Sequence, residues 1–173
     1  MSYLSYSENM NENLLMFLLR DHKKYMPIVE FFDNATQGLD ELTQGDAELI
    51  ASEVSQANGS AFCNGIRRGM TEALDADHRD FQKEKLAAIL AFALKLNLDA
   101  TSIQKSDIET VLKAGWSEQT VEDVVGLVAV QNLYNIIASG LGFKALPETV
   151  FAEIGKETVQ KGSYAASFRA FLE

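Results

Sequence analysis

The sequence is poor in the residues that form covalent or metal-bound scaffolds. It holds one cysteine, Cys63, in 173 residues. A single cysteine excludes an internal disulfide framework, a zinc site built from cysteines and an iron–sulfur cluster. The two histidines have no metal-ligand partners at useful spacing along the chain. We therefore expect no bound metal.

Positive charge is also scarce. The 15 Lys and Arg residues are outnumbered by 25 Asp and Glu residues, which gives a net charge of −10 at pH 7. The basic residues never cluster beyond pairs such as Lys23-Lys24 and Arg67-Arg68. This balance provides no basic surface that would attract the phosphates of nucleic acid or anionic lipid. We expect neither a nucleic-acid partner nor a membrane partner.

Long hydrophobic runs are absent as well. The longest apolar stretches fall well short of the ~20 residues that a membrane-crossing helix needs. Residues 1–5 lack the basic region and the long apolar run of a signal peptide. The sequence therefore predicts a soluble, cytoplasmic protein.

Only two prolines, Pro27 and Pro147, interrupt the chain, which leaves room for long helices. Hydrophobic residues make up 47% and charged residues 23%, the composition of an ordinary globular protein. The length fits one domain with a sizeable core. No pair of strands or hairpin turn stands out. We predict an all-α fold and a single domain over residues 1–173.

Apolar residues recur at helical spacing along most of the chain. The predicted helices span 14–19, 27–38, 46–58, 60–74, 81–96, 106–115 and 117–140, with two short helices after Pro147 that are separated at Gly162. We expect Asp46 and Ser60 to cap two of them, and the spacing from Ser106 to Glu109 is that of a capping box. The 117–140 segment is apolar on more than one face, which predicts a central, buried helix.

The sharpest chemical signal lies between Glu48 and Arg67. Ser60 and Cys63 form an S-x-x-C pattern across the start of a predicted helix, and Arg67 follows Cys63 by one helical turn. With Ser60 as the N-cap, Cys63 lies near free N–H groups and the positive end of the helix dipole. The dipole and the guanidinium both favour thiolate over thiol. Glu48 could position a water or move a proton if the two helices pack side by side.

This passage resembles the carboxymuconolactone decarboxylase-like superfamily and, within it, the alkylhydroperoxidase D (AhpD-like) peroxidase-related branch. The family pattern is a Glu, eleven residues, C-x-x-C, three residues and a His. Here Glu48, Ser60, Cys63 and Arg67 occupy its positions, and residues 85–95, 107–115 and 131–135 resemble the later family helices in order and spacing. The resemblance covers roughly residues 25–145. It implies an AhpD-like helical domain, followed by a C-terminal helical extension over residues 146–173.

The resemblance also implies roles for these residues. In family members that reduce hydroperoxides, the second cysteine attacks the peroxide, the first resolves the product as a disulfide, and the Glu and His relay a proton. Cys63 aligns with the attacking cysteine and Glu48 with the relay Glu, whereas Ser60 replaces the resolving cysteine. Arg67 replaces the His, and a guanidinium cannot take up a proton at working pH. The two-cysteine cycle is therefore not available to this chain.

A one-cysteine cycle is the leading hypothesis. The Cys63 thiolate would attack a hydroperoxide and become a sulfenic acid, which an external thiol would then reduce. In this cycle Arg67 stabilises the thiolate and Glu48 handles the proton. The resemblance implies no organic cofactor, and it implies a homo-oligomer: a dimer, trimer or hexamer.

Two other classes of function remain as alternatives. The protein could be a redox-inactive member that serves as a ligand-binding or interaction scaffold, because a lone cysteine in an apolar helix is more often a small buried core residue. It could instead act on a small carboxylated metabolite, with Arg67 or Arg68 holding the carboxylate. Ser60, after Asn-Gly, is a good helix cap by itself, and we favour this interpretation over a chemical role.

Two further groups of residues bear on the site. Asn132 and Asn135 lie within an apolar helix, and buried amides need partners, which a pocket or a subunit contact would supply. Gly65 and Gly69 are four residues apart, and we expect them to permit close helix packing.

Overall fold

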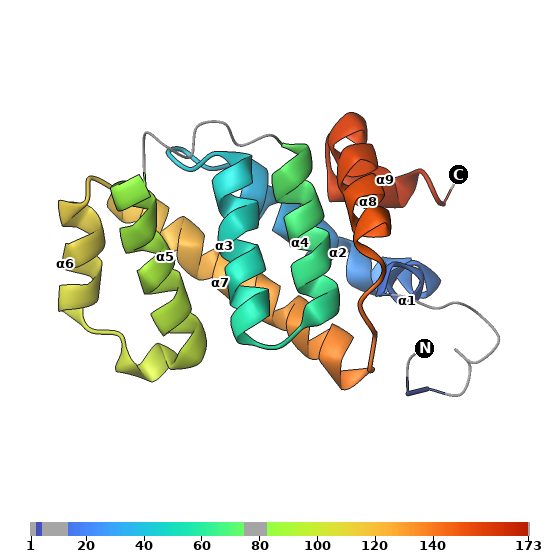
Figure 1. Ribbon diagram of the computed structural model, residues 1–173, viewed down its shortest axis with the longest axis horizontal. Helices are drawn as coiled ribbons and strands as arrows, with labels where there is room; N and C mark the ends of the chain where they lie inside the picture. Colours follow the sequence, from blue (N-terminus) through green and yellow to red (C-terminus); the bar gives the residue numbers. More distant parts are fainter. Residues whose placement is uncertain (1–2, 5–13, 75–82, 173) are drawn as a thin grey trace.

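The computed structural model describes residues 3–4, 14–74 and 83–172, and this part of the chain contains helices and no strand. The all-α prediction is confirmed. The elements, in chain order, are α1 (Leu14–Arg20), α2 (His22–Gln37), α3 (Gln44–Ala57), α4 (Ala61–Ala73), α5 (Lys83–Leu98), the 3-10 turn η3 (Ala100–Ser102), α6 (Lys105–Lys113), α7 (Glu118–Gly140), α8 (Glu148–Lys161) and α9 (Tyr164–Arg169) (Figure 1).

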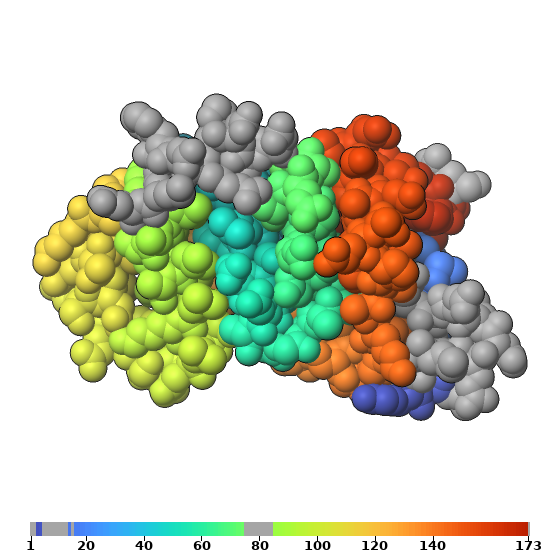
Figure 2. Space-filling view, in the orientation of Figure 1, coloured from blue at the N-terminus to red at the C-terminus, as the bar shows by residue number. Residues whose placement is uncertain are grey.

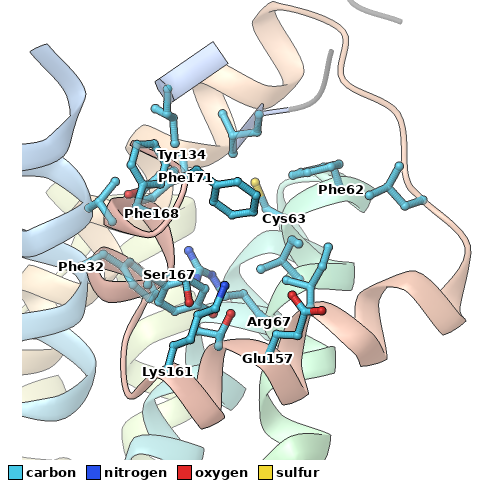
Figure 3. Close-up of a pocket in the computed structure, with 18 residues that line it drawn as sticks. Phe32, Phe62, Cys63, Arg67, Tyr134, Glu157, Lys161, Ser167, Phe168 and Phe171 are labelled. Atoms are coloured by element: carbon cyan, nitrogen blue, oxygen red, sulfur yellow. The ribbon is translucent and has the colours of Figure 1, made fainter. Parts of the chain in front are cut away.

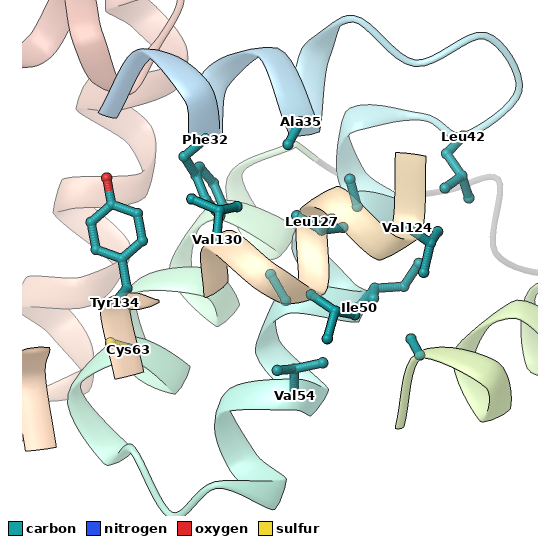
Figure 4. Close-up of a cluster of buried hydrophobic side chains, with 14 of the residues drawn as sticks. Phe32, Ala35, Leu42, Ile50, Val54, Cys63, Val124, Leu127, Val130 and Tyr134 are labelled. Atoms are coloured by element: carbon teal, nitrogen blue, oxygen red, sulfur yellow. The ribbon is translucent and has the colours of Figure 1, made fainter. Parts of the chain in front are cut away.

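The long helix α7 is the centre of the fold, as its sequence predicts. It passes behind α3, α4 and α5 in Figure 1 and packs against α2, α3 and α5. Val124, Leu127 and Val130 of α7 are buried in the core together with Ile50 of α3 and Phe32 of α2 (Figure 4). Because neighbours surround α7 on several sides, it has no single apolar face.

Contrary to the expectation from the sequence, α7 is long and apolar enough in composition to cross a membrane. Half of its most apolar 18-residue window is, however, buried inside the protein. The apolar residues on those buried faces pack against α2, α3 and α5. We therefore read α7 as a core helix.

Two predicted helix caps are shifted in the structure. Thr43, not Asp46, is the N-cap of α3: its hydroxyl accepts from the Asp46 N–H, and the Asp46 carboxylate accepts from the Thr43 N–H. Asp46 is thus the third helical residue of a capping box. Likewise α6 is capped by Gln104 and Asp107, two residues before the predicted pair. The same polar residue types cap a helix from the N-cap position and from the N3 position. The sequence pattern therefore locates the start of a helix only to within one turn.

The start of α2 was also predicted wrongly. The helix begins at His22, five residues before Pro27. Proline removes one backbone donor, so the carbonyl of Lys23 loses its helical partner. Lys23 and Pro27 are both exposed, so that carbonyl lies near solvent and the helix continues through the proline.

The helices α4 and α8 approach each other very closely, and they lie side by side on the face drawn in Figure 2. A Cβ on Gly69 would lie 2.2 Å from the carbonyl oxygen of Phe151, and a Cβ on Gly155 would lie 2.2 Å from that of Gly69. A Cβ on Gly65 would lie 2.1 Å from a ring carbon of Phe151. The predicted role of Gly65 and Gly69 in close packing is confirmed. Through this contact the C-terminal segment covers the site helix α4.

Candidate functional site

The structure brings Glu48, Cys63 and Arg67 into one buried region. Cys63 and Arg67 lie one turn apart on α4, and Glu48 is on α3, which packs alongside α4. Their exposed fractions are 0% for Glu48, 3% for Cys63 and 5% for Arg67. Arg67 Nη1 lies 3.7 Å from Glu48 Oε2. The arrangement hypothesised from the spacing, two helices side by side, is present.

Aromatic rings enclose the guanidinium of Arg67. Its central carbon lies 3.6 Å from the ring centroid of Phe32 and 4.7 Å from that of Tyr164. Tyr134 is the third ring, at 5.6 Å. The Nε–H donates a 3.0 Å hydrogen bond to Oε1 of Gln131. A cation held by ring faces and one amide keeps its charge away from water at a reduced desolvation cost.

Glu48 is a buried carboxyl group with one hydroxyl partner. The Tyr164 hydroxyl donates to Glu48 Oε2 at 3.2 Å. Burial raises the pKa of Glu48 to about 7, because desolvation of the carboxylate outweighs the attraction of Arg67 and the bond from Tyr164. Near neutral pH this group can therefore both accept and release a proton.

Cys63 is a buried thiol, and here the electrostatic prediction was wrong. Burial raises the pKa of Cys63 above its ordinary value, although the hydrogen bond with Ser60 and the charge of Arg67 both lower it. Desolvation penalises the thiolate more than these two interactions favour it. The resting form of Cys63 is thus the thiol.

Ser60 stands immediately before α4, as predicted, but its side chain makes no capping hydrogen bond. The hydroxyl of this buried residue interacts instead with the Cys63 sulfur. Ser60 is thus the N-cap residue of α4, as predicted, but it does not cap the helix through its side chain. Its side chain belongs to the environment of the thiol.

A polar network behind Arg67 holds the guanidinium in place. Gln131 Nε2 donates to Ser55 Oγ at 2.7 Å and to Asn135 Oδ1 at 3.1 Å, and Ser55 Oγ donates to Asn135 Oδ1 at 3.1 Å. The side-chain oxygen of Asn135 therefore finds its partners within the chain, whereas its Nδ2 is buried without a hydrogen-bond partner. Gln131 is fully buried and links this network to Arg67.

Asn132 belongs to a separate amide cluster nearer the surface. It shares hydrogen bonds with Asn58 and Asn97, which come from the ends of α3 and α5. Neither Asn132 nor Asn135 lines the cavity beside Cys63 and Arg67. A subunit contact at either residue stays a prediction.

A cavity of about 170 Å³ opens beside Cys63 and Arg67 (Figure 3). Most of its wall is apolar, contributed by residues of α1, α2, α4, α8 and α9: Leu14, Leu18, Val29, Phe32, Phe62, Ile66, Ile154 and Phe168. Tyr164 also lines the cavity and connects it to Glu48 behind the wall. Of the two arginines considered for a carboxylate, only Arg67 lines it. Arg68 is exposed and pairs with Glu72 and Glu148.

Several residues of this site were missed in the sequence. Phe32 and Tyr164 come from α2 and α9, far from the S-x-x-C segment, and no local pattern marks them. Gln131 could have been noticed as a third amide beside Asn132 and Asn135 in an apolar helix. Among the described residues, no group of three or more His, Cys, Asp or Glu side chains is placed to hold a metal ion.

No protein-family model and no curated protein matches the sequence. Two solved structures are similar at a TM-score of 0.70. One is a peroxidase-related protein from Silicibacter sp. TM1040, with 19% identity over 82% of this chain and 81% of that chain. The other is an alkylhydroperoxidase AhpD core, a peroxidase-related protein from Ralstonia eutropha JMP134, with 20% identity over 82% of this chain and 79% of that chain. These similarities confirm the AhpD-like helical fold.

Proposed function

We propose that this protein reduces organic hydroperoxides at Cys63, with an external thiol as the reductant. One observation carries the proposal: Cys63, Arg67 and Tyr164 line the same largely apolar cavity, and Tyr164 joins that cavity to Glu48. A nucleophile, a fixed positive charge and a titratable proton acceptor are the groups that this reaction needs.

In the oxidative step, Cys63 sulfur attacks the terminal peroxide oxygen. The S–O bond forms, the O–O bond breaks, and sulfur loses two electrons as the hydroperoxide becomes an alcohol. The thiol proton passes to ionised Glu48 through the Tyr164 hydroxyl and returns to the leaving alkoxide. Arg67 stabilises the negative charge that develops on sulfur and then on oxygen.

In the reductive step, two equivalents of a small thiol restore the enzyme. The first attacks the sulfenic acid, releases water and forms a mixed disulfide with Cys63. The second displaces Cys63 and leaves as the oxidised disulfide. An external reductant is required because Ser60 occupies the resolving position.

The experiment measures consumption of cumene hydroperoxide by reduced protein, with and without a thiol reductant. A nucleophilic probe traps the sulfenic acid at Cys63 for mass spectrometry. We expect consumption that disappears in Cys63→Ser and persists in Ser139→Ala, an exposed serine near the end of α7. A rate no faster than that of free cysteine would overturn the proposal.

A second candidate is a redox-inactive protein that uses the cavity only to bind a ligand. The raised pKa of Cys63 favours it, because a thiol is a poor nucleophile. The hydroperoxide assay separates the two functions when ligand binding is measured beside it: binding without hydroperoxide consumption supports this second candidate.

We also propose that the protein acts in the cytoplasm, where thiol reductants are abundant.

We propose further that the protein assembles with copies of itself. α7 exposes Val125, Leu133 and Ile136, the last with an exposed fraction of 68%. Such an apolar stripe gains free energy when a second copy covers it. Light scattering on the purified protein measures the mass of the assembly, and a monomer at all concentrations would overturn the proposal.

A further inference from the structure

The guanidinium of Arg67 is only partly satisfied by the protein. Its Nε–H is bonded to Gln131, but its Nη1 is buried without a hydrogen-bond partner. Nη1 forms an ion pair with Glu48 Oε2, but the distance of 3.7 Å is too long for a hydrogen bond. A buried charged donor without a hydrogen-bond partner is costly, and a bound anion can satisfy such a group.

The charge balance of the cavity also favours an anion. Arg67, Lys161 and Glu157 are the charged residues among those that line it. Lys161 and Glu157 are exposed on α8, whereas Arg67 is buried in the wall. Glu48, with its pKa near 7, is ionised in only about half of the molecules at neutral pH. The inner wall therefore carries positive charge, in a protein whose net charge is −10.

The rest of the cavity wall favours a ligand with a hydrocarbon body. The buried rings of Phe32, Phe62 and Phe168 and the side chain of Ile66 surround a cavity of about 170 Å³. For comparison, an apolar cavity of about 150 Å³ holds a benzene molecule. Ser167 adds a hydroxyl that is buried without a hydrogen-bond partner.

We infer that this cavity binds an apolar monocarboxylic acid of about the size of benzoic or hexanoic acid, with its carboxylate on Arg67. The planar guanidinium fits a carboxylate better than it fits a neutral hydroxyl. The hydrocarbon body lies against the aromatic and aliphatic wall. The site is the cavity of the proposed function, but binding does not require Cys63 to react.

Fluorine NMR on the Cys63→Ser protein tests the inference without thiol chemistry. The probes are 4-fluorobenzoate and its neutral counterpart 4-fluorobenzyl alcohol. We expect the acid to bind at least tenfold more tightly than the alcohol. Equal affinity, a preference for the alcohol or no binding of the acid would overturn the inference.

Two arginine variants locate the carboxylate. In Arg67→Gln the preference for the acid disappears, whereas in Arg68→Gln, an exposed neighbour outside the cavity, it is retained. Lys161→Gln tests whether the exposed Lys161, and not the buried Arg67, holds the carboxylate. A preference that survives Arg67→Gln but disappears in Lys161→Gln would overturn the assignment to Arg67.

A cavity-filling variant keeps the test decisive if Arg67→Gln does not fold. Ile66→Trp fills the cavity and leaves Arg67 in place, so both probes should lose binding. Unchanged binding of the acid to a folded Ile66→Trp protein would overturn the inference. Acid binding without hydroperoxide consumption by the wild type would instead contradict only the proposed function. Hydroperoxide consumption by the wild type without acid binding would contradict only this inference.

Discussion

Arg67 Nη1 and Glu48 Oε2 are 3.7 Å apart in the protein interior, yet the pKa of Glu48 is raised to about 7. The attraction between the two groups is thus smaller than the cost of moving the carboxylate out of water. Because Glu48 is only about half ionised near neutral pH, while Arg67 stays charged, small changes at the site shift the charge of Glu48. This makes Glu48 a titratable group in the range where cells operate.

The raised pKa of Glu48 predicts how stability depends on pH. The pKa is about 7 in the folded protein and 4.5 in an unfolded chain, so the folded state binds more protons between these values. The contribution of Glu48 to the free energy of unfolding is fully present below pH 4.5 and is lost as the pH rises through 7. The expected loss is about 3 kcal/mol. Glu48→Gln should remove this component.

Urea unfolding at pH 5 and pH 8 measures the effect in both proteins. Glu53→Gln, on the same helix but outside the network, is the control and should keep the wild-type pH dependence. An unchanged pH dependence in Glu48→Gln would contradict the role assigned to this carboxyl group.

The contact between α4 and α8 predicts that small substitutions are costly there. Gly69→Ala and Gly155→Ala each place a methyl group 2.2 Å from a backbone oxygen of the facing helix. Overpacking of this kind should lower the free energy of unfolding by about 1–3 kcal/mol or more. Gly140→Ala is the matched control, because nothing lies within 4 Å of its added Cβ. Thermal unfolding compares the three, and equal stability would refute the tight contact.

Gln131 is expected to be important for stability although it is a single amide. Gln131→Leu leaves Arg67 Nε without its acceptor and removes the donor to Ser55 and Asn135. We expect a loss of about 2–4 kcal/mol, the penalty for leaving buried polar groups unpaired. Gln119→Leu, on the exposed start of α7, should change stability by less than about 0.5 kcal/mol. Chemical denaturation measures both, and equal effects would contradict the network.

The interaction between Ser60 and Cys63 predicts that a second thiol at position 60 would reach the first. In Ser60→Cys, mild oxidation should form an intramolecular disulfide, because the two side chains already interact in the native protein. Mass spectrometry detects the loss of two hydrogen atoms. Ala61→Cys is the control: position 61 is exposed, and residues two apart on a helix do not face each other. Two free thiols in oxidised Ser60→Cys would contradict the observed geometry.

The sequence by itself determined which segments form helices. Amphipathic spacing and the glycines that follow α3, α6 and α8 located most of the elements, because helical hydrogen bonds and caps form between residues close in the chain. The errors in the helix prediction, at Pro27, Asp46 and Ser106, concern only where a helix begins. The spacing of Glu48, Cys63 and Arg67 also predicted that these residues meet.

Only the tertiary structure decided the chemical state of the site. Spacing predicted a thiolate at Cys63, but burial in the folded protein favours the thiol. The partners of Arg67 come from α2, α7 and α9: Phe32, Gln131, Tyr134 and Tyr164. A pKa depends on loss of water and on charges within a few ångströms, and helices distant in sequence supply both. For that reason the pattern around Cys63 indicated where the site lies, and the fold set its charge.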